Sequence, residues 1–190
     1  MKHGGQEPAV TSGSEILKQT ITGLLADKSR ARPATVAYRT LGRDGWIDVT
    51  FDAHARRVVR VGLALQAAGV GRGDRVCIIG DVSPEWMIAD AATIAIGAIT
   101  VGAYFTSSPE ELDYYLEDSG ACLLFVGTAT QLAIAARSPR ALGLSRIVVL
   151  DPDWQAAPGD PANACAVAAF EGAPVADPLA GGPRGPCERL

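Results

Sequence analysis

The most constraining feature of this sequence is a regular alternation between short apolar runs and helix-forming segments that begin with a capping residue. The apolar runs are residues 75–80, 99–104, 121–126 and 147–150. They lack polar alternation, which is typical of strands covered on both faces of a sheet. Ser83, Ser108 and Thr128 precede the intervening segments and can accept hydrogen bonds from a first helical turn. The pattern predicts a layered α/β fold with a mainly parallel sheet and flanking helices.

The segment before the first apolar run predicts two helices separated by a hairpin. Apolar residues recur at helical spacing over residues 15–26, and β-prone residues fill residues 35–38 and 46–49 on either side of a glycine-bearing turn. Thr50 can cap a second helix over residues 51–68. We expect this second helix to lead directly into the parallel sheet.

Composition divides the chain into three parts. Residues 1–13 are polar and glycine-bearing, and we expect a disordered start there. Residues 14–151 hold the alternating pattern and predict one domain with a genuine core. Residues 152–190 are rich in proline, glycine and alanine, so we expect a mostly unstructured tail.

The charge balance and the cysteines exclude several classes of protein. The net charge of −4 comes from intermixed acidic and basic residues, without the basic surface that nucleic acids require, so we expect no nucleic-acid partner. The cysteines lack metal-ligand or redox spacing and are Cys77, Cys122, Cys165 and Cys187. No apolar stretch follows the amino terminus as in a secretory signal, so the expected compartment is the cytoplasm.

An uncharged stretch over residues 91–105 nearly reaches the length of a membrane span. Asp90 precedes it, Gly97 interrupts it, and its second half has strand-forming character. We therefore interpret it as a buried helix followed by a buried strand.

Candidate ligand-contacting residues follow the second apolar run. Tyr104, Thr106 and Ser107 lie at the expected carboxyl end of a buried strand, where open α/β sheets place ligands. The sequence shows no catalytic group and no metal site, and we expect His54 to be a solvated side chain. The glycines at 69, 71 and 73 leave a helix and enter a strand, so they indicate a tight connection instead of a phosphate-binding loop.

Three runs together resemble the AMP-forming acyl-CoA synthetases, within the adenylate-forming ligase family. The first joins a capped helix to a glycine turn and a strand: Thr50, Phe51, Gly69, Gly71, Gly73, Asp74, Arg75 and Val76. The second is a helix start followed by small residues: Ser83, Pro84, Glu85, Trp86, Ala89, Ala92, Gly97 and Ala98. The third is similar to a stretch of long-chain fatty-acid ligases: Tyr104, Thr106, Ser108, Pro109, Glu110, Glu111, Leu112, Tyr115, Leu116, Asp118 and Ser119.

The resemblance implies a two-step reaction and an incomplete amino-terminal subdomain of the adenylate-forming ligase fold. In the family, a fatty acid or other carboxylate attacks the α-phosphate of ATP with the help of magnesium, and coenzyme A then displaces AMP. That chemistry needs a loop rich in serine, threonine and glycine with a lysine, and a second lysine on a mobile domain. This sequence has lysine only at Lys2, Lys18 and Lys28 and lacks such a loop.

We therefore expect an amino-terminal ligase fragment that binds no cofactor and is inactive alone, through truncation or a shifted reading frame. The alternative is a non-catalytic α/β binding or interaction module that self-associates through an exposed sheet edge. A receiver-like signalling domain would need a clustered acidic pocket and a late lysine, which the sequence does not contain.

Overall fold

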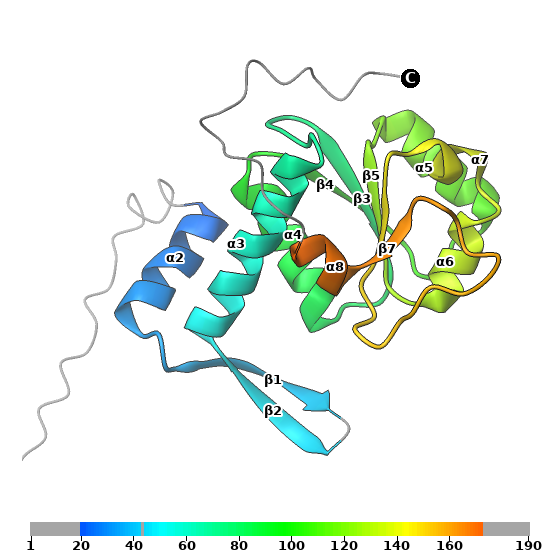
Figure 1. Cartoon of the computed structure of the whole chain (residues 1–190). Helices are drawn as coiled ribbons and strands as arrows, with labels where there is room; N and C mark the ends of the chain where they lie inside the picture. The colour runs from blue at the N-terminus through cyan, green and yellow to red at the C-terminus, as the bar shows by residue number, and fades with distance from the viewer. Residues whose placement is uncertain (1–19, 43, 173–190) are drawn as a thin grey trace, which may run out of the picture.

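The computed structural model describes residues 20–172 except residue 43 and shows a parallel sheet between two layers of helices (Figure 1). The sheet contains five strands, β3 (Arg75–Ile79), β4 (Ile99–Ala103), β5 (Leu123–Val126), β6 (Ile147–Val149) and β7 (Ala164–Ala166). All pairings within it are parallel, and the spatial order is β4-β3-β5-β6-β7. The predicted α/β class and the layered arrangement are confirmed.

Two sets of helices cover the two faces of the sheet. The first face is covered by α3 (Phe51–Ala67), α4 (Pro84–Ala95) and α8 (Val167–Glu171). The second is covered by α5 (Pro109–Ser119), α6 (Ala129–Ala135) and α7 (Pro139–Gly143). Strand residues alternate between the two cores, because successive side chains of a strand point to opposite faces: Ile78 belongs to the first core, and Cys77 and Ile79 to the second.

Helices α3 to α6 begin where the sequence predicts, because each of these starts is encoded locally. The side chains of Thr50, Ser83, Ser108 and Thr128 accept hydrogen bonds from the first turns of α3, α4, α5 and α6. For residues 91–105 the expected order of helix, turn and strand is confirmed, since the end of α4, a turn at Gly97 and strand β4 occupy them. The strand is not buried as expected, because β4 lies at the edge of the sheet and Ile99 at its start is exposed. Within the described residues, no helix is long and apolar enough to cross a membrane.

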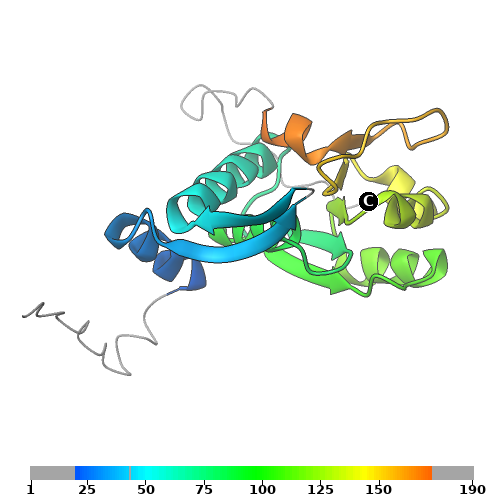
Figure 2. The ribbon, with the colours of Figure 1, turned by 90° about the horizontal axis from the view of Figure 1, so that it is seen from below.

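A two-stranded hairpin extends from the amino end of α3 (Figures 1 and 2). It pairs β1 (Val36–Gly42) with β2 (Gly45–Thr50) in antiparallel register, as expected. Backbone hydrogen bonds from Phe51 to Thr35 and from Asp52 to Pro33 tie its base to α3. The helix before the hairpin, α2 (Ile21–Ala31), is capped by Thr20 and continues beyond the expected residue 26. The expected start at residue 15 lies outside the described residues.

The structure differs from the expected unstructured tail over residues 153–172. Strand β7 pairs with β6 there, and α8 follows immediately. Val167 and Phe170 of α8 are buried in the first core, and the rings of Phe170 and Phe125 meet edge to face at 6.0 Å between centroids. The segment is ordered although it contains few large apolar residues, because two of its side chains are buried in the core and its strand pairs with β6. The remainder of the expected tail and the expected disordered start lie outside the described residues.

Candidate functional site

The strand order places a topological switch point between β3 and β5. From β3 the chain crosses by α4 on the first face to β4, and it returns by α5 on the second face to β5, on the other side of β3. The segments that follow β3 and β5 therefore leave toward opposite faces. Open α/β sheets bind ligands at such a divergence, at the carboxyl ends of the strands.

Two glycines meet at this switch point. The backbone amide of Gly127 donates to the carbonyl of Ile79 at 2.8 Å, which holds the end of β5 against the end of β3. A Cβ atom placed on Gly80 would lie 2.8 Å from the Cα atom of Gly127, closer than carbon atoms approach without a clash. Both positions need glycine because the two backbones touch.

The three expected ligand-contacting residues lie in the turn between β4 and α5, one strand away from the switch point. Tyr104 is 76% exposed and Thr106 is also exposed, whereas Ser107 is buried. The amide of Ser107 donates to the carbonyl of Tyr104 at 3.0 Å and closes the turn. Tyr104 and Thr106 are thus the members of this set that a ligand could reach.

Sequence reasoning missed Gln131, which links this turn to the switch point. Its side-chain oxygen accepts from the amide of Thr128 at 3.1 Å and from the Thr128 hydroxyl at 2.6 Å. Its side-chain nitrogen donates to the carbonyl of Phe105 at 3.1 Å. The spacing of Thr128 and Gln131 is a capping-box signal, which could have located the first contact but not the second.

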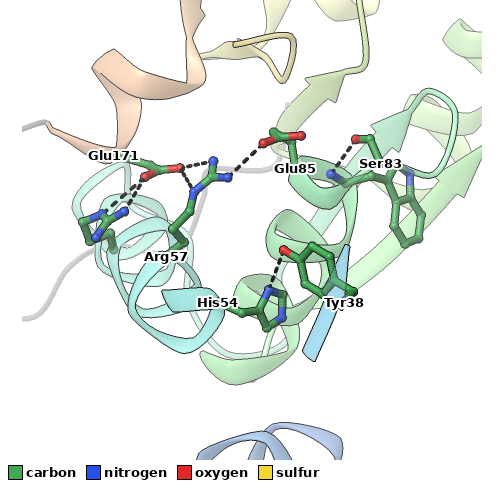
Figure 3. A network of polar contacts seen from close by, with 8 residues as sticks. Tyr38, His54, Arg57, Ser83, Glu85 and Glu171 are labelled. Carbon is green, nitrogen blue, oxygen red and sulfur yellow. Dashed lines mark hydrogen bonds and ion pairs between the residues drawn. The ribbon is translucent and has the colours of Figure 1, made fainter. Parts of the chain in front are cut away.

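A second polar cluster, the Arg57 cluster, lies on the first face near the start of α4 (Figure 3). Arg57 of α3 pairs with Glu85 of α4 at 2.9 Å and with Glu171 of α8 at 2.8 Å. Arg60 pairs with Glu171 at 3.3 Å. Burial opposes the charge on Arg57, but the hydrogen bonds to Glu171 and Glu85 outweigh it and raise the pKa of Arg57. This cluster joins three helices beside the exit from β3.

His54 does not have the expected solvated environment, because the hairpin covers it. Its Nδ1 atom lies 3.3 Å from the hydroxyl of Tyr38, and the two rings meet edge to face. Half-burial, and secondarily the charge of Arg57, lower the pKa of His54. Burial raises the pKa of Tyr38. A neutral histidine that anchors the hairpin fits this geometry.

One acidic residue and one cysteine of the described part of the chain have clear structural roles. Glu111 closes a capping box with Ser108, its carboxylate accepting from the Ser108 amide at 2.8 Å. Cys77 is fully buried in β3, which raises the pKa of its thiol to about 12. No group of three or more histidine, cysteine or acidic side chains among the described residues could hold a metal ion. Within the described residues, the carboxyl edge of the sheet thus combines an exposed turn with no such group of possible metal ligands.

Comparison with known proteins relates this sheet to one group of enzymes. A long-chain-fatty-acid–CoA ligase of Mycobacterium tuberculosis is 36% identical over 116 residues, which cover 61% of this chain and 19% of that protein. A 3-hydroxybenzoate–CoA ligase of an Aromatoleum species is 35% identical over 118 residues, covering 62% and 20%. The chain thus spans about a fifth of the length of the curated relatives it matches.

Comparison with solved structures also finds CoA ligases that share this fold. The crystal structure of a putative long-chain-fatty-acid CoA ligase from Rhodopseudomonas palustris superposes with a TM-score of 0.66 at 20% identity, over 80% of this chain and 36% of that one. Residues 25–180 match the family described as AMP-binding enzyme, which confirms the resemblance seen in the three sequence runs. The chain belongs to the AMP-binding enzyme family.

Proposed function

We propose that this chain forms the amino-terminal sheet of an AMP-forming acyl-CoA ligase, which activates a carboxylic acid through an acyl-adenylate. The observation that carries the proposal is the family match over residues 25–180, joined to a parallel sheet of the ligase fold. The names of the relatives include both fatty-acid and hydroxybenzoate ligases, so a carboxylate is the substrate class that they share. Within that class we favour a fatty acid, because the third sequence run is similar to long-chain ligases.

These 190 residues are proposed not to complete adenylation alone. Developing charge on a triphosphate is stabilised by magnesium and by lysine or arginine side chains. The sequence has no lysine after Lys28. Arg57, beside the first turn of α4, is already paired with Glu85 and Glu171. ATP, magnesium and coenzyme A would therefore act where other ligase segments complete the site.

We assign substrate contact to the turn after β4 and extend the folded domain to residue 172. Tyr104 and Thr106 are exposed at the carboxyl edge of the sheet, and Ser107 would act through the backbone of the turn. Strand β7 extends the sheet beyond β6 and helix α8 packs in the first core, so we propose that the domain expected over residues 14–151 includes both.

The experiment is an activity assay of the purified chain with palmitate, ATP, magnesium and coenzyme A. AMP and palmitoyl-CoA should stay at the level of an enzyme-free blank, while the full-length M. tuberculosis relative serves as the positive control. Turnover by the 190-residue chain would refute the proposed dependence on other segments. Fractionation of cells that produce the chain would test the expected cytoplasmic location.

The second candidate function is an interaction module without catalysis, and one observation favours it. Strand β4 has β3 on one side and no described strand on the other, and Ile99 at its start is exposed. An unpaired strand edge with an apolar residue promotes pairing with another chain. Sedimentation velocity should then show concentration-dependent dimers, whereas a monomer at all concentrations argues against this function.

A further inference from the structure

We propose that Gln131 is a positioning residue that fixes the turn formed by residues 104–107. The importance of this turn rests on the proposed function, which assigns substrate contact to it. The contacts of Gln131 themselves do not depend on that assignment. The inference can therefore be tested without a substrate.

Both ends of the Gln131 carboxamide are engaged, and they hold different parts of the chain. Its oxygen accepts two hydrogen bonds from Thr128, at the start of α6. Its nitrogen donates to the carbonyl of Phe105, in the turn after β4. The residue is 7% exposed, so water cannot readily replace either contact.

The location of the contact makes it more than a helix cap. Strands β4 and β5 are the two neighbours of β3, so the bond from Gln131 to Phe105 joins the segments that follow both neighbours. The Cβ position of Gly127 lies 3.5 Å from the Gln131 oxygen, which brings the carboxamide beside the switch point. Gln131 therefore sets the distance between the candidate substrate turn and the divergence of β3 and β5.

The turn has one other described internal restraint, the hydrogen bond from the amide of Ser107 to the carbonyl of Tyr104. That bond closes the turn upon itself but does not attach it to the rest of the sheet. The Phe105 carbonyl lies between these two residues and is the point of attachment to α6. Losing the Gln131 donor should thus free the turn while leaving α6 capped.

Two substitutions separate positioning from capping. Gln131→Glu keeps an oxygen acceptor for Thr128 but replaces the donor to Phe105 by a second oxygen, which cannot donate when ionised. Gln131→Met keeps the length of the side chain and removes both functions. Gln155→Glu, at an exposed position in the segment before β7, controls for the added charge.

The experiment is amide hydrogen exchange of the whole 190-residue chain, measured residue by residue with NMR. Gln131→Glu should speed exchange of the Ser107 amide about tenfold, as expected for a lost buried hydrogen bond, with α6 amides within about twofold of the unsubstituted chain. The Phe105 carbonyl ¹³C signal should shift in the same variant. Gln131→Met should speed exchange in both places, and Gln155→Glu in neither.

Two results would overturn the proposal. One is an unchanged Ser107 exchange rate and Phe105 carbonyl signal in Gln131→Glu. The other is an equal acceleration across the turn and α6, which would reduce Gln131 to a helix cap. The proposed substrate contact is tested separately, in a ligase where other segments complete the site around this chain. If substitutions of Tyr104 and Thr106 leave palmitate activation unchanged there, the substrate contact is contradicted, while the exchange result for Gln131 still stands.

Discussion

Replacing Arg57 by methionine should destabilise the fold far more than the same replacement one residue earlier. Arg57, Glu85 and Glu171 have side-chain exposures of 29%, 16% and 11%, so the substitution leaves two shielded carboxylates without their shared cation. Exposed ion pairs contribute about 0–1 kcal/mol, and breaking a fully buried pair costs about 3–5 kcal/mol. The intermediate burial, with Arg60 still beside Glu171, sets the expected loss at about 2 kcal/mol.

Arg56→Met is the matched control, because Arg56 lies on the same helix and also pairs with an acidic residue. Its pair with Asp52 is formed at 2.8 Å, with exposures of 72% and 40%. An exposed pair of this spacing contributes little to stability, because water and salt screen its charges. Both substitutions remove one charge and keep a long side chain, so their difference isolates the effect of burial.

Thermal unfolding followed by circular dichroism measures the difference. For a chain of this size about 1 kcal/mol corresponds to about 2–4 °C, so Arg57→Met should lower the midpoint by about 4–8 °C and Arg56→Met by about 1–2 °C. Arg57→Met should lose much of its effect when Glu171→Gln is already present, because the two residues share one contact. Equal midpoints for the two arginine variants would refute the role assigned to the Arg57 cluster.

Three further perturbations test other parts of the structure. The pKa of His54 is lowered in the folded state, so the contribution of His54 to stability should be constant above about pH 6.5 and be lost as pH drops through the folded pKa. The thermal midpoint should therefore be lower at pH 5.5 than at pH 7.5, and this difference should be smaller in His54→Gln than in the unsubstituted chain. An equal difference in the two proteins would contradict this. Gly80→Ala should cost about 2 kcal/mol or more through its contact with Gly127, whereas Gly102→Ala, with open space around its Cβ position, should be nearly neutral in denaturant unfolding. Cys77 should resist alkylation at pH 8 in the folded chain and react after denaturation, as followed by mass spectrometry of the peptide that contains it. Rapid labelling of Cys77 in the folded chain would show that this thiol is accessible and not buried.

The parts of the fold that could be predicted from the sequence are those encoded by local signals. A cap such as Ser108 and a turn glycine such as Gly69 act within a few residues, so their effects can be read without knowing the rest of the chain. The apolar runs are equally explicit, because a strand buried on both faces leaves no polar alternation. These signals predict the parallel strands through β6 and the helices α3 to α6.

Strand β7 and helix α8 have no comparable local signal. Strand β7 contains three small side chains of its own, and the composition around it is that of a flexible segment. Its pairing depends on the open side of β6, and α8 is held by contacts of Phe170 with Phe125 and of Glu171 with Arg57. The last of these joins residues 114 positions apart, a relation that a single sequence does not contain.

The candidate site shows the same division between local and distant information. The position of Tyr104 after an apolar run correctly places it at the carboxyl edge of the sheet, because that step needs only the direction of the strand. The attachment of its turn through Gln131 depends on β5 lying beside β3, which is a property of the strand order. Helix capping is enough to explain a glutamine at that position, so the sequence gives no reason to expect its second contact, the one with the Phe105 carbonyl.

The two polar clusters act on the same edge of the sheet from opposite faces. The Arg57 cluster holds the first turn of α4, which follows β3, on the first face. Gln131 holds the turn after β4 to the start of α6 on the second face. Because the clusters share no residue, each can keep its segment in place when the other is broken. The proposed substrate edge, fixed independently from both faces, would need little rearrangement when the phosphate-binding segments of a ligase meet it, which reduces the ordering cost of assembling the site.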